Sequence, residues 1–333
     1  LSPSTTQNGD FLSCKVSVLD SEGASDSVIE SVSIVNTSPV IDSITLDPNV
    51  GIRIGDSLSC NVTSSDINND VLNTTYNWTN QDGTSLGTNQ ILFLDPNTTS
   101  SFDDITCQVV IVDGQGGSVQ DSVSITIENT EPIIGTIEII PNTPISQDDL
   151  VCTPSNIQDI NLDVITFSYT WFVNDIEQSE TTDTLNSPFS VNDVIRCQAL
   201  PNDGFDDGSI VEATATIINT LPTIDTIAIN PNTNVLVDSI VNCDVTTSDI
   251  DGDVPVITYE WLKEDETLLG TDASLQLNPV TVFRDDVITC IATATDEQGE
   301  FVTEQASITP INSSPVILST TILPMTHEVV PDK

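Results

Sequence analysis

Three short acidic segments recur in the chain, and they consist of residue types that bind hard metal ions. Each has the pattern Asp, any residue, Asn or Asp, any residue, Asp. The three sets are Asp66/Asn68/Asp70, Asp159/Asn161/Asp163 and Asp249/Asp251/Asp253. Because Ca²⁺ binds about six to eight oxygen atoms of carboxylates and carbonyls, we hypothesise a Ca²⁺ site at each segment. The alternative is that these residues are ordinary solvated aspartates in turns.

The acidic segments keep a nearly fixed distance from cysteine residues. Asp66 and Asp249 lie six residues after a cysteine, and Asp159 lies seven residues after one. A second series of aspartates, each six residues after another cysteine, comprises Asp20, Asp113, Asp203 and Asp296. The acidic residues therefore belong to a repeated unit that the cysteines mark.

Aromatic residues mark the same repeated unit. Every Tyr and Trp occurs in a Tyr-x-Trp sequence, at Tyr76/Trp78, Tyr169/Trp171 and Tyr259/Trp261. Residues two apart on a strand lie on the same face, so we predict that these pairs lie in a core rather than stack on a ligand. The Trp residues are 93 and 90 residues apart, close to the length of one small β-sandwich of about 100 residues. Each copy can therefore bury its own core.

Short strings ending in proline separate the copies. They run from Asn36 to Pro39, Asn129 to Pro132, Asn219 to Pro222 and Asn312 to Pro315. Proline and the residue before it favour extended backbone, which suits a short, stiff passage between two strands. We therefore predict the C-terminal part of a domain at 1–37, complete domains at 38–130, 131–220 and 221–313, and the start of a further domain at 314–333.

Within each copy, apolar and polar residues alternate. Runs such as 31–35, 121–127 and 212–218 are rich in Val, Ile and Thr, the pattern of half-buried strands. Turn signals of Asp-Gly type fall between these runs, and no stretch has helical periodicity. We predict an all-β chain of beads on a string, with about seven strands in each bead.

The order Cys, Trp, Cys in each copy resembles that of immunoglobulin-type β-sandwiches. The sets are Cys60/Trp78/Cys107, Cys152/Trp171/Cys197 and Cys243/Trp261/Cys290, with the cysteines 47, 45 and 47 residues apart. The chain departs from antibody domains at their corner tyrosine, where Ile105, Ile195 and Ile288 stand. The acidic loop, Tyr-x-Trp and Asn-x-x-Pro resemble more closely the PKD-like and cadherin-like repeats of microbial surface proteins, over nearly the whole chain.

The resemblance implies specific pairings and a specific metal position. It implies the disulfides Cys60–Cys107, Cys152–Cys197 and Cys243–Cys290, with buried reduced thiols as the alternative. It also places the loops after the first and second cysteines at the same end of each sandwich. Asp113, Asp203 and Asp296 would then join the acidic segments in the Ca²⁺ sites, beside the passage from the preceding copy.

The composition of the chain restricts the classes of molecule that it can bind and the compartment in which it is found. The net charge of −45, from 6 Lys+Arg and 51 Asp+Glu, excludes electrostatic attraction to nucleic acid or to anionic membranes. No apolar run is long enough to span a membrane, so we expect any export signal or anchor outside these residues. Regularly placed cysteines favour an oxidising compartment. We therefore expect an extracellular location at a cell surface.

Six sequons could carry N-linked glycans if the source glycosylates exported proteins. Their acceptors are Asn36, Asn61, Asn73, Asn77, Asn97 and Asn312. Because Asn77 precedes the core residue Trp78 on the same strand, we expect its side chain to point outward and remain accessible.

No catalytic constellation is visible in the sequence, so we predict a protein that is not an enzyme. We interpret it as a structural array, a stalk, adhesin or filament component, whose partners are other copies of itself or surface glycans and proteins. Alternatives are an array of carbohydrate- or protein-binding modules, or accessory domains of a larger surface enzyme. If chains assemble end to end, residues 315–333 of one molecule could complete the half-domain of the next by strand donation.

Overall fold

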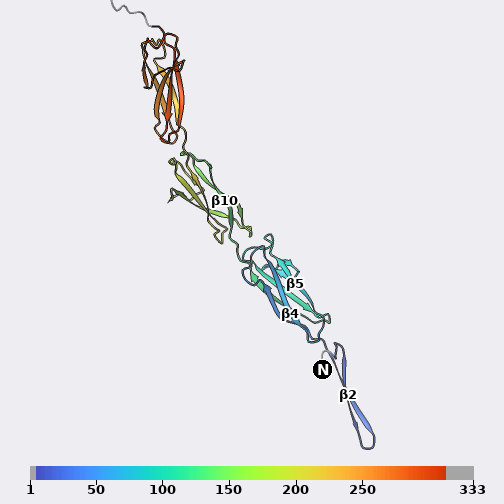
Figure 1. Cartoon of the computed structure of the whole chain (residues 1–333). Coiled ribbons are helices and arrows are strands. Elements are labelled where there is room, and N and C mark those ends of the chain that lie inside the picture. Colours follow the sequence, from blue (N-terminus) through green and yellow to red (C-terminus); the bar gives the residue numbers. More distant parts are fainter. Residues whose placement is uncertain (1–4, 313–333) are drawn as a thin grey trace, which may run out of the picture.

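The computed structural model describes residues 5–312, and in this range the chain is all-β without any helix. It consists of one β-hairpin followed by three β-sandwiches, which succeed one another in an extended row (Figure 1). The strand order described below makes each sandwich immunoglobulin-like, as the sequence predicts. The predicted start of a further domain at 314–333 lies outside the described residues.

The N-terminal hairpin corresponds to the second half of a sandwich. It pairs β1 (Phe11–Leu19) with β2 (Ser25–Ser33) in antiparallel fashion. Cys14 on β1 is exposed and is not in a disulfide. Asp20 in the connecting turn accepts hydrogen bonds from the backbone N–H groups of Glu22 and Ala24. Asp113 of sandwich 1 accepts from backbone N–H groups at the same two spacings.

Each sandwich has seven strands in a three-stranded and a four-stranded sheet. Sandwich 1 contains β3 (Val40–Asp47), β4 (Ser57–Ser65), β5 (Asn73–Thr79), β6 (Ser85–Gly87), β7 (Ile91–Phe93), β8 (Asp104–Val112) and β9 (Ser118–Thr126). The order is β3-β4-β7 in one sheet and β6-β5-β8-β9 in the other. All pairings are antiparallel.

Sandwiches 2 and 3 repeat this topology. Sandwich 2 contains β10 (Ile133–Ile140), β11 (Leu150–Gln158), β12 (Thr166–Val173), β13 (Ile176–Glu177), β14 (Thr184–Leu185), β15 (Val194–Asn202) and β16 (Val211–Thr216). Sandwich 3 contains β17 (Thr223–Asn230), β18 (Ile240–Ser248), β19 (Val256–Lys263), β20 (Leu268–Gly270), β21 (Ser274–Gln276), β22 (Ile288–Thr295) and β23 (Phe301–Ile308).

Alternation of side chains builds each core. On β8, Ile105, Cys107, Val109 and Ile111 point inward and are completely buried, while the residues between them are more exposed. The three Trp side chains are also completely buried, and their indole N–H groups donate to backbone carbonyls eleven residues later, at 2.8–2.9 Å. The tyrosines pack partly buried against the same clusters. The predicted core role of Tyr-x-Trp is therefore confirmed.

Three disulfides connect the two sheets of the sandwiches. Cys60 on β4 is bonded to Cys107 on β8, and the corresponding pairs are Cys152–Cys197 and Cys243–Cys290. In each sandwich the second cysteine is the register partner of the Trp on the neighbouring strand. The sulfur bridge therefore lies beside the indole in the middle of the core.

Candidate cation sites at the joints

Two loops meet at the end of each sandwich that faces the preceding part of the chain. We call residues 66–70, 159–163 and 249–253 the acidic loops, and residues 113–117, 203–208 and 296–300 the aspartate turns. In sandwich 1, one carboxylate oxygen each from Asp66, Asp70 and Asp113 lies within 4.8 Å of the others. Asp159, Asp163 and Asp203 form the same cluster in sandwich 2.

The aspartate turns hold their carboxylates in a fixed orientation. Asp113 Oδ1 accepts the backbone N–H groups of Gln115 and Gly117 at 2.8 and 2.9 Å, and Asp113 is only 3% exposed. Asp203 Oδ1 accepts from Phe205 and Asp206, and Asp296 Oδ1 accepts from Glu300. Each turn therefore presents the second oxygen, Oδ2, towards the joint.

An asparagine from the preceding string binds that second oxygen. Asn36 Nδ2 donates to Asp113 Oδ2 at 2.6 Å, and Asn219 Nδ2 donates to Asp296 Oδ2 at 2.8 Å. In sandwich 2, Asn129 Nδ2 donates to Asp203 Oδ2 and also to Asp206 Oδ2. The asparagine therefore fastens the string to the sandwich that follows it.

The next residue of the string binds the acidic loop. The backbone N–H groups of Thr37 and Thr130 donate to Asn68 Oδ1 and Asn161 Oδ1 at 3.0 and 3.1 Å. Both the N–H and the hydroxyl of Thr220 donate to Asp251 Oδ2. Within each acidic loop the first Asp accepts the N–H of the third residue, which closes the turn.

Several buried oxygens at each joint have no hydrogen-bond partner, and at sandwiches 1 and 2 they include members of the two carboxylate clusters. In the acidic loops these are the Oδ2 atoms of Asp66, Asp70, Asp159, Asp163, Asp249 and Asp253, and Asp251 Oδ1. Asn36 Oδ1 and Asn219 Oδ1 of the strings are in the same state. A buried carboxylate oxygen without a partner is costly. A hard cation would satisfy these atoms, and the donor set of carboxylate and amide oxygens fits Ca²⁺.

Crowding of the carboxylates perturbs their protonation. Burial raises the pKa of Asp70, and the charges of Asp66 and Asp113 raise it further. Burial likewise raises the pKa of Asp163 and of Asp249, again with neighbouring carboxylates adding to the effect. These directions are those of acidic groups held together without a compensating positive charge.

In the aspartate turns the carboxyl pKa values are lowered instead of raised. The hydrogen bond from Asn36 lowers the pKa of Asp113 despite its burial. Burial on its own would raise the pKa of Asp203 and of Asp296. The hydrogen bonds from Asn129 and Asn219, together with those from the backbone, outweigh it and lower both values. These carboxylates therefore stay charged in mild acid.

The third joint differs from the others in one residue of its acidic loop. Asp251 stands where the other loops have Asn68 and Asn161. The loop of sandwich 3 therefore contains three carboxylates instead of two. Burial on its own would raise the pKa of Asp251, but hydrogen bonds from Thr220 and Ser146 lower it.

The sequon asparagines lie in different surroundings. Asn36 is half-buried at the first joint and bound to Asp113, so a glycan on its Nδ2 would displace that hydrogen bond. Asn77 is half-buried rather than fully accessible, and its Oδ1 accepts the hydroxyl of Ser85. The remaining acceptors Asn61, Asn73, Asn97 and Asn312 are exposed.

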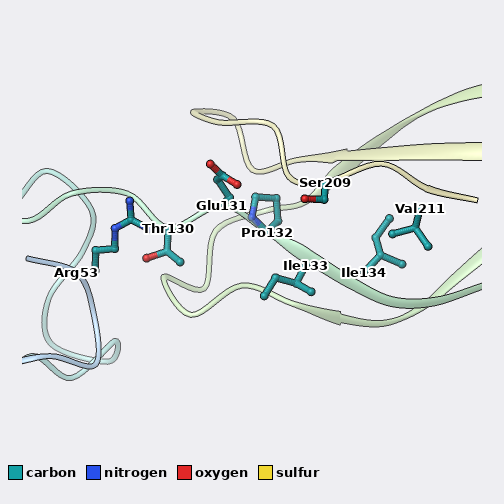
Figure 2. Close-up of a pocket in the computed structure, with 8 residues that line it drawn as sticks. All are labelled: Arg53, Thr130, Glu131, Pro132, Ile133, Ile134, Ser209 and Val211. Carbon is teal, nitrogen blue, oxygen red and sulfur yellow. The ribbon is translucent and has the colours of Figure 1, made fainter. Parts of the chain in front are cut away.

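The string between sandwiches 1 and 2 runs along a shallow hollow that both sandwiches line (Figure 2). Arg53 of sandwich 1 lies at one end, and Ser209 and Val211 of sandwich 2 lie at the other, with Glu131 and Pro132 of the string between them. The string is therefore in contact with both neighbours over its short length.

The sequence pattern indicates the acidic loops and the aspartate turns but not their binding to the strings. It marks Asn129 and Asn219 only as boundary residues, and Asn36 as a boundary residue and glycan acceptor. The signal was present, because an asparagine occupies the same position in every string. An amide group at a fixed distance before each acidic loop could have been predicted to bind it.

Strand order, disulfides and repetition define the chain as a tandem array of immunoglobulin-like β-sandwiches. No family model and no curated protein matches the chain. Between residues 5 and 312 no helix has the length and apolar character needed to cross a membrane.

Solved structures with similarity to the chain are also tandem-domain proteins. One is a Ca²⁺-stabilised adhesin with which an Antarctic bacterium binds ice, with 16% identity, coverage of 91% of this chain and 82% of that chain, and a TM-score of 0.34. Another comprises three N-terminal domains of the Highly Immunogenic Outer Capsid protein of bacteriophage RB49, with 17% identity, coverage of 83% and 100%, and a TM-score of 0.27. The N-terminal eight immunoglobulin domains of Down Syndrome Cell Adhesion Molecule have 14% identity, coverage of 92% and 40%, and a TM-score of 0.35.

Proposed function

We propose that the chain is a structural segment of an extracellular surface protein, a stalk, adhesin or filament component that gives reach and display. The observation that carries this proposal is the row of self-contained sandwiches, each joined to the next by a short string whose Asn and Thr are hydrogen-bonded to the following sandwich (Figure 1). Three disulfides suit an oxidising exterior. Domain boundaries at 37/38, 130/131, 220/221 and 313/314 remain part of the proposal.

Location is tested on intact cells of the source organism. Labelled antibodies against sandwich 2 should bind the cell surface without permeabilisation. Binding only after the cells are opened would overturn the extracellular proposal. Electron microscopy of the isolated material should then show thin threads or stalks rather than compact particles.

We further propose that Ca²⁺ binds at the three joints. Its ligands would come from the acidic loop and aspartate turn of each sandwich and from the asparagine of the string before it. At the first joint these are Asp66, Asp70 and Asp113, whose carboxylate oxygens lie within 4.8 Å of one another, and Asn36, whose Oδ1 is buried without a hydrogen-bond partner. A bound cation would offset the repulsion between carboxylates and connect the string to the sandwich.

Isothermal titration of Ca²⁺ into the metal-free chain tests the sites. We expect saturable binding of about three ions, one at each joint. Replacing one carboxylate at each joint, Asp70→Asn, Asp163→Asn and Asp253→Asn together, should abolish or greatly weaken the binding. The matched control is Asp26→Asn, Asp121→Asn and Asp244→Asn, because these exposed strand residues change the net charge equally.

The two sets of variants distinguish a site from a diffuse ion atmosphere. If the control triple loses as much binding as the joint triple, Ca²⁺ is attracted only by the net charge. Absence of any binding heat and of any Ca²⁺-dependent shift in melting temperature with the wild-type chain would also overturn the proposal. Mg²⁺, which demands a smaller octahedral cage, should bind more weakly.

The alternative of a carbohydrate-binding face has less support. Phe172 lies under the guanidinium group of Arg196, 3.9 Å from its ring centroid, so this face of the ring is covered. Phe205 is in edge contact with Phe102 and does not offer a flat platform with it. Exposed aromatic rings on a common face are what stacking on sugars would need.

A further inference from the structure

Three residues at the joint between sandwiches 1 and 2 depart from the repeat pattern. Five residues before the second cysteine, Phe102 stands where other copies have Gly9, Asn192 and Asp285. Five residues before the first cysteine, Gly55 stands where other copies have Gln147 and Asp238. Two residues after the aspartate of its turn, Phe205 stands where other copies have Glu22, Gln115 and Gln298.

Phe102 adopts a backbone conformation that is unfavourable for its side chain. Its φ is 66°, in the left-handed region. The aligned Asn192 and Asp285 have φ of 69°, and Gly9 has 84°, but these residue types tolerate such values. A bulky residue at this position persists only where surrounding contacts compensate.

The compensating contact comes from the next sandwich. The rings of Phe102 and Phe205 are 5.0 Å apart between centroids, at an interplanar angle of 65°. This edge-to-face arrangement is favourable for aromatic pairs. Both side chains are otherwise about half exposed, at 53% and 56%. The two departures from the repeat are therefore partners in one contact across the joint.

Gly55 permits a second contact across the same joint. Its φ is +90°, and a Cβ atom there would lie 3.0 Å from Cδ1 of Ile160 in the acidic loop of sandwich 2. Ile160 therefore rests on the backbone of sandwich 1. The aligned Ile67 is 69% exposed, compared with 45% for Ile160 and 48% for Ile250 of sandwich 3.

Ser101 of sandwich 1 adds a polar contact to the string. Its hydroxyl donates to Asn129 Oδ1 at 2.9 Å, and Asn129 is in turn bound to Asp203 of sandwich 2. The aligned residue in sandwich 2 is Val191, which cannot make such a bond. Apolar and polar contacts therefore surround the string between sandwiches 1 and 2.

The joint between sandwiches 2 and 3 is built differently. A hydrogen bond crosses it, in which the buried hydroxyl of Ser146 donates to the carbonyl of Ile250 at 3.2 Å. Among the described residues, no aromatic pair crosses this joint. Its acidic loop has the additional carboxylate Asp251.

We infer that the Phe102–Phe205 contact, with Ile160 seated on Gly55, fixes sandwiches 1 and 2 as one rigid pair without metal, and that the array bends at the joint between sandwiches 2 and 3. The fixed pair of sandwiches 1 and 2 does not depend on the proposed function. We also expect Ca²⁺ to narrow the motion at the joint between sandwiches 2 and 3, and this expectation rests on the Ca²⁺ sites of the proposed function.

Spin-label distance distributions measure both joints separately. In a Cys14→Ser background, Ser122→Cys with Ser168→Cys reports on sandwiches 1 and 2, and Ser168→Cys with Thr258→Cys reports on sandwiches 2 and 3. All three label positions are exposed strand residues. In metal-free buffer we expect a narrow distribution for the first pair of labels and a broad one for the second.

Two variants test the contact itself. Phe205→Ala should broaden the first distribution, shifting the balance of docked and undocked sandwiches by about 2- to 10-fold. Phe102→Asn should do the same without lowering the stability of sandwich 1, because Asn tolerates the left-handed backbone. Phe301→Ala, an exposed aromatic residue of sandwich 3, is the control and should leave the first distribution unchanged.

The outcomes separate this inference from the Ca²⁺ proposal. Equal widths at both joints in metal-free wild-type chain, or no response to Phe205→Ala and Phe102→Asn, would overturn the rigid pair. A narrow first distribution that responds to the variants, with no effect of Ca²⁺ on the second, would retain the rigid pair and reject metal-dependent stiffening.

Discussion

Single carboxyl groups at the joints respond to pH in two opposite directions. Asp70, Asp163 and Asp249 have raised pKa values, whereas Asp113, Asp203 and Asp296 have lowered ones. A carboxyl group whose pKa is raised in the folded chain takes up its proton at a higher pH when folded than when unfolded. The metal-free chain therefore becomes more stable as the pH falls from the folded-state pKa towards the unfolded-state pKa. A lowered pKa contributes stability that is lost at lower pH, as pH falls through the folded value.

We therefore predict opposite effects of mild acid on the two forms of the chain. From about pH 7 to pH 5, the melting temperature of the metal-free chain should rise slightly, since repulsion between carboxylates is relieved. That of the Ca²⁺-loaded chain should fall, because protons compete with the ion for the same oxygens. Calorimetric scans at both pH values check this, and parallel changes in the two forms would contradict it.

The sequence predicted the acidic residues better than their neighbours. Asp113 and Asp203 lie beside the acidic loops, where their distances from the cysteines place them once the strand directions implied by the immunoglobulin-type resemblance are assumed. The contact of Phe102 with Phe205 could not be predicted, because aligning the copies identifies each residue as a departure from the repeat but does not place the two side chains together. Only the coordinates bring a departure from the pattern in one copy against a departure in the next.

At the scale of elements, the disulfide between β11 and β15 is predicted to dominate the stability of sandwich 2. Replacing both cysteines, Cys152→Ala with Cys197→Ala, frees a loop of 45 residues and should cost about 4 kcal/mol on the chain-entropy account. Pulse proteolysis in urea, which identifies the sandwich that opens, should detect cleavage between residues 150 and 216 at lower urea. Cleavage elsewhere should be unchanged.

Cys14→Ser is the matched control for the loss of a thiol. Cys14 is exposed and outside any disulfide, so its replacement should leave all three sandwiches equally stable. An unchanged urea midpoint in the Cys152/Cys197 double variant would indicate that packing around Trp171 suffices without the bridge.

Long strands could be predicted from the sequence, and short ones could not. Alternation is visible in β9 and β16, where each face has several residues to establish the period. β13 and β14 have only two residues each, too few for any periodicity. These short strands form the edges of their sheets by pairing with β12 and β11 in the folded sandwich. The local sequence contains no signal for that pairing.

At the scale of the whole molecule, net charge is predicted to make stability depend on salt. The charge of −45 is screened poorly at low ionic strength, because the Debye length falls from about 30 Å at 0.01 M to about 8 Å at 0.15 M. The melting temperature of the metal-free chain should therefore rise with NaCl over this range. A nonionic solute at equal osmolality should not reproduce the rise, and a midpoint indifferent to NaCl would contradict the prediction.

The binding of each string to the sandwich that follows it determines which piece of the chain can be copied or moved intact. Asn36 and Thr37 are bound by sandwich 1, Asn129 and Thr130 by sandwich 2, and Asn219 and Thr220 by sandwich 3. A duplicated or transplanted segment that begins at the asparagine contains the sandwich together with the Asn and Thr that bind its acidic loop and aspartate turn. A segment that begins a few residues later lacks them, so the acidic end of its sandwich is exposed to water. Gene fusions and recombined arrays should therefore tolerate a boundary before the asparagine and not one after it.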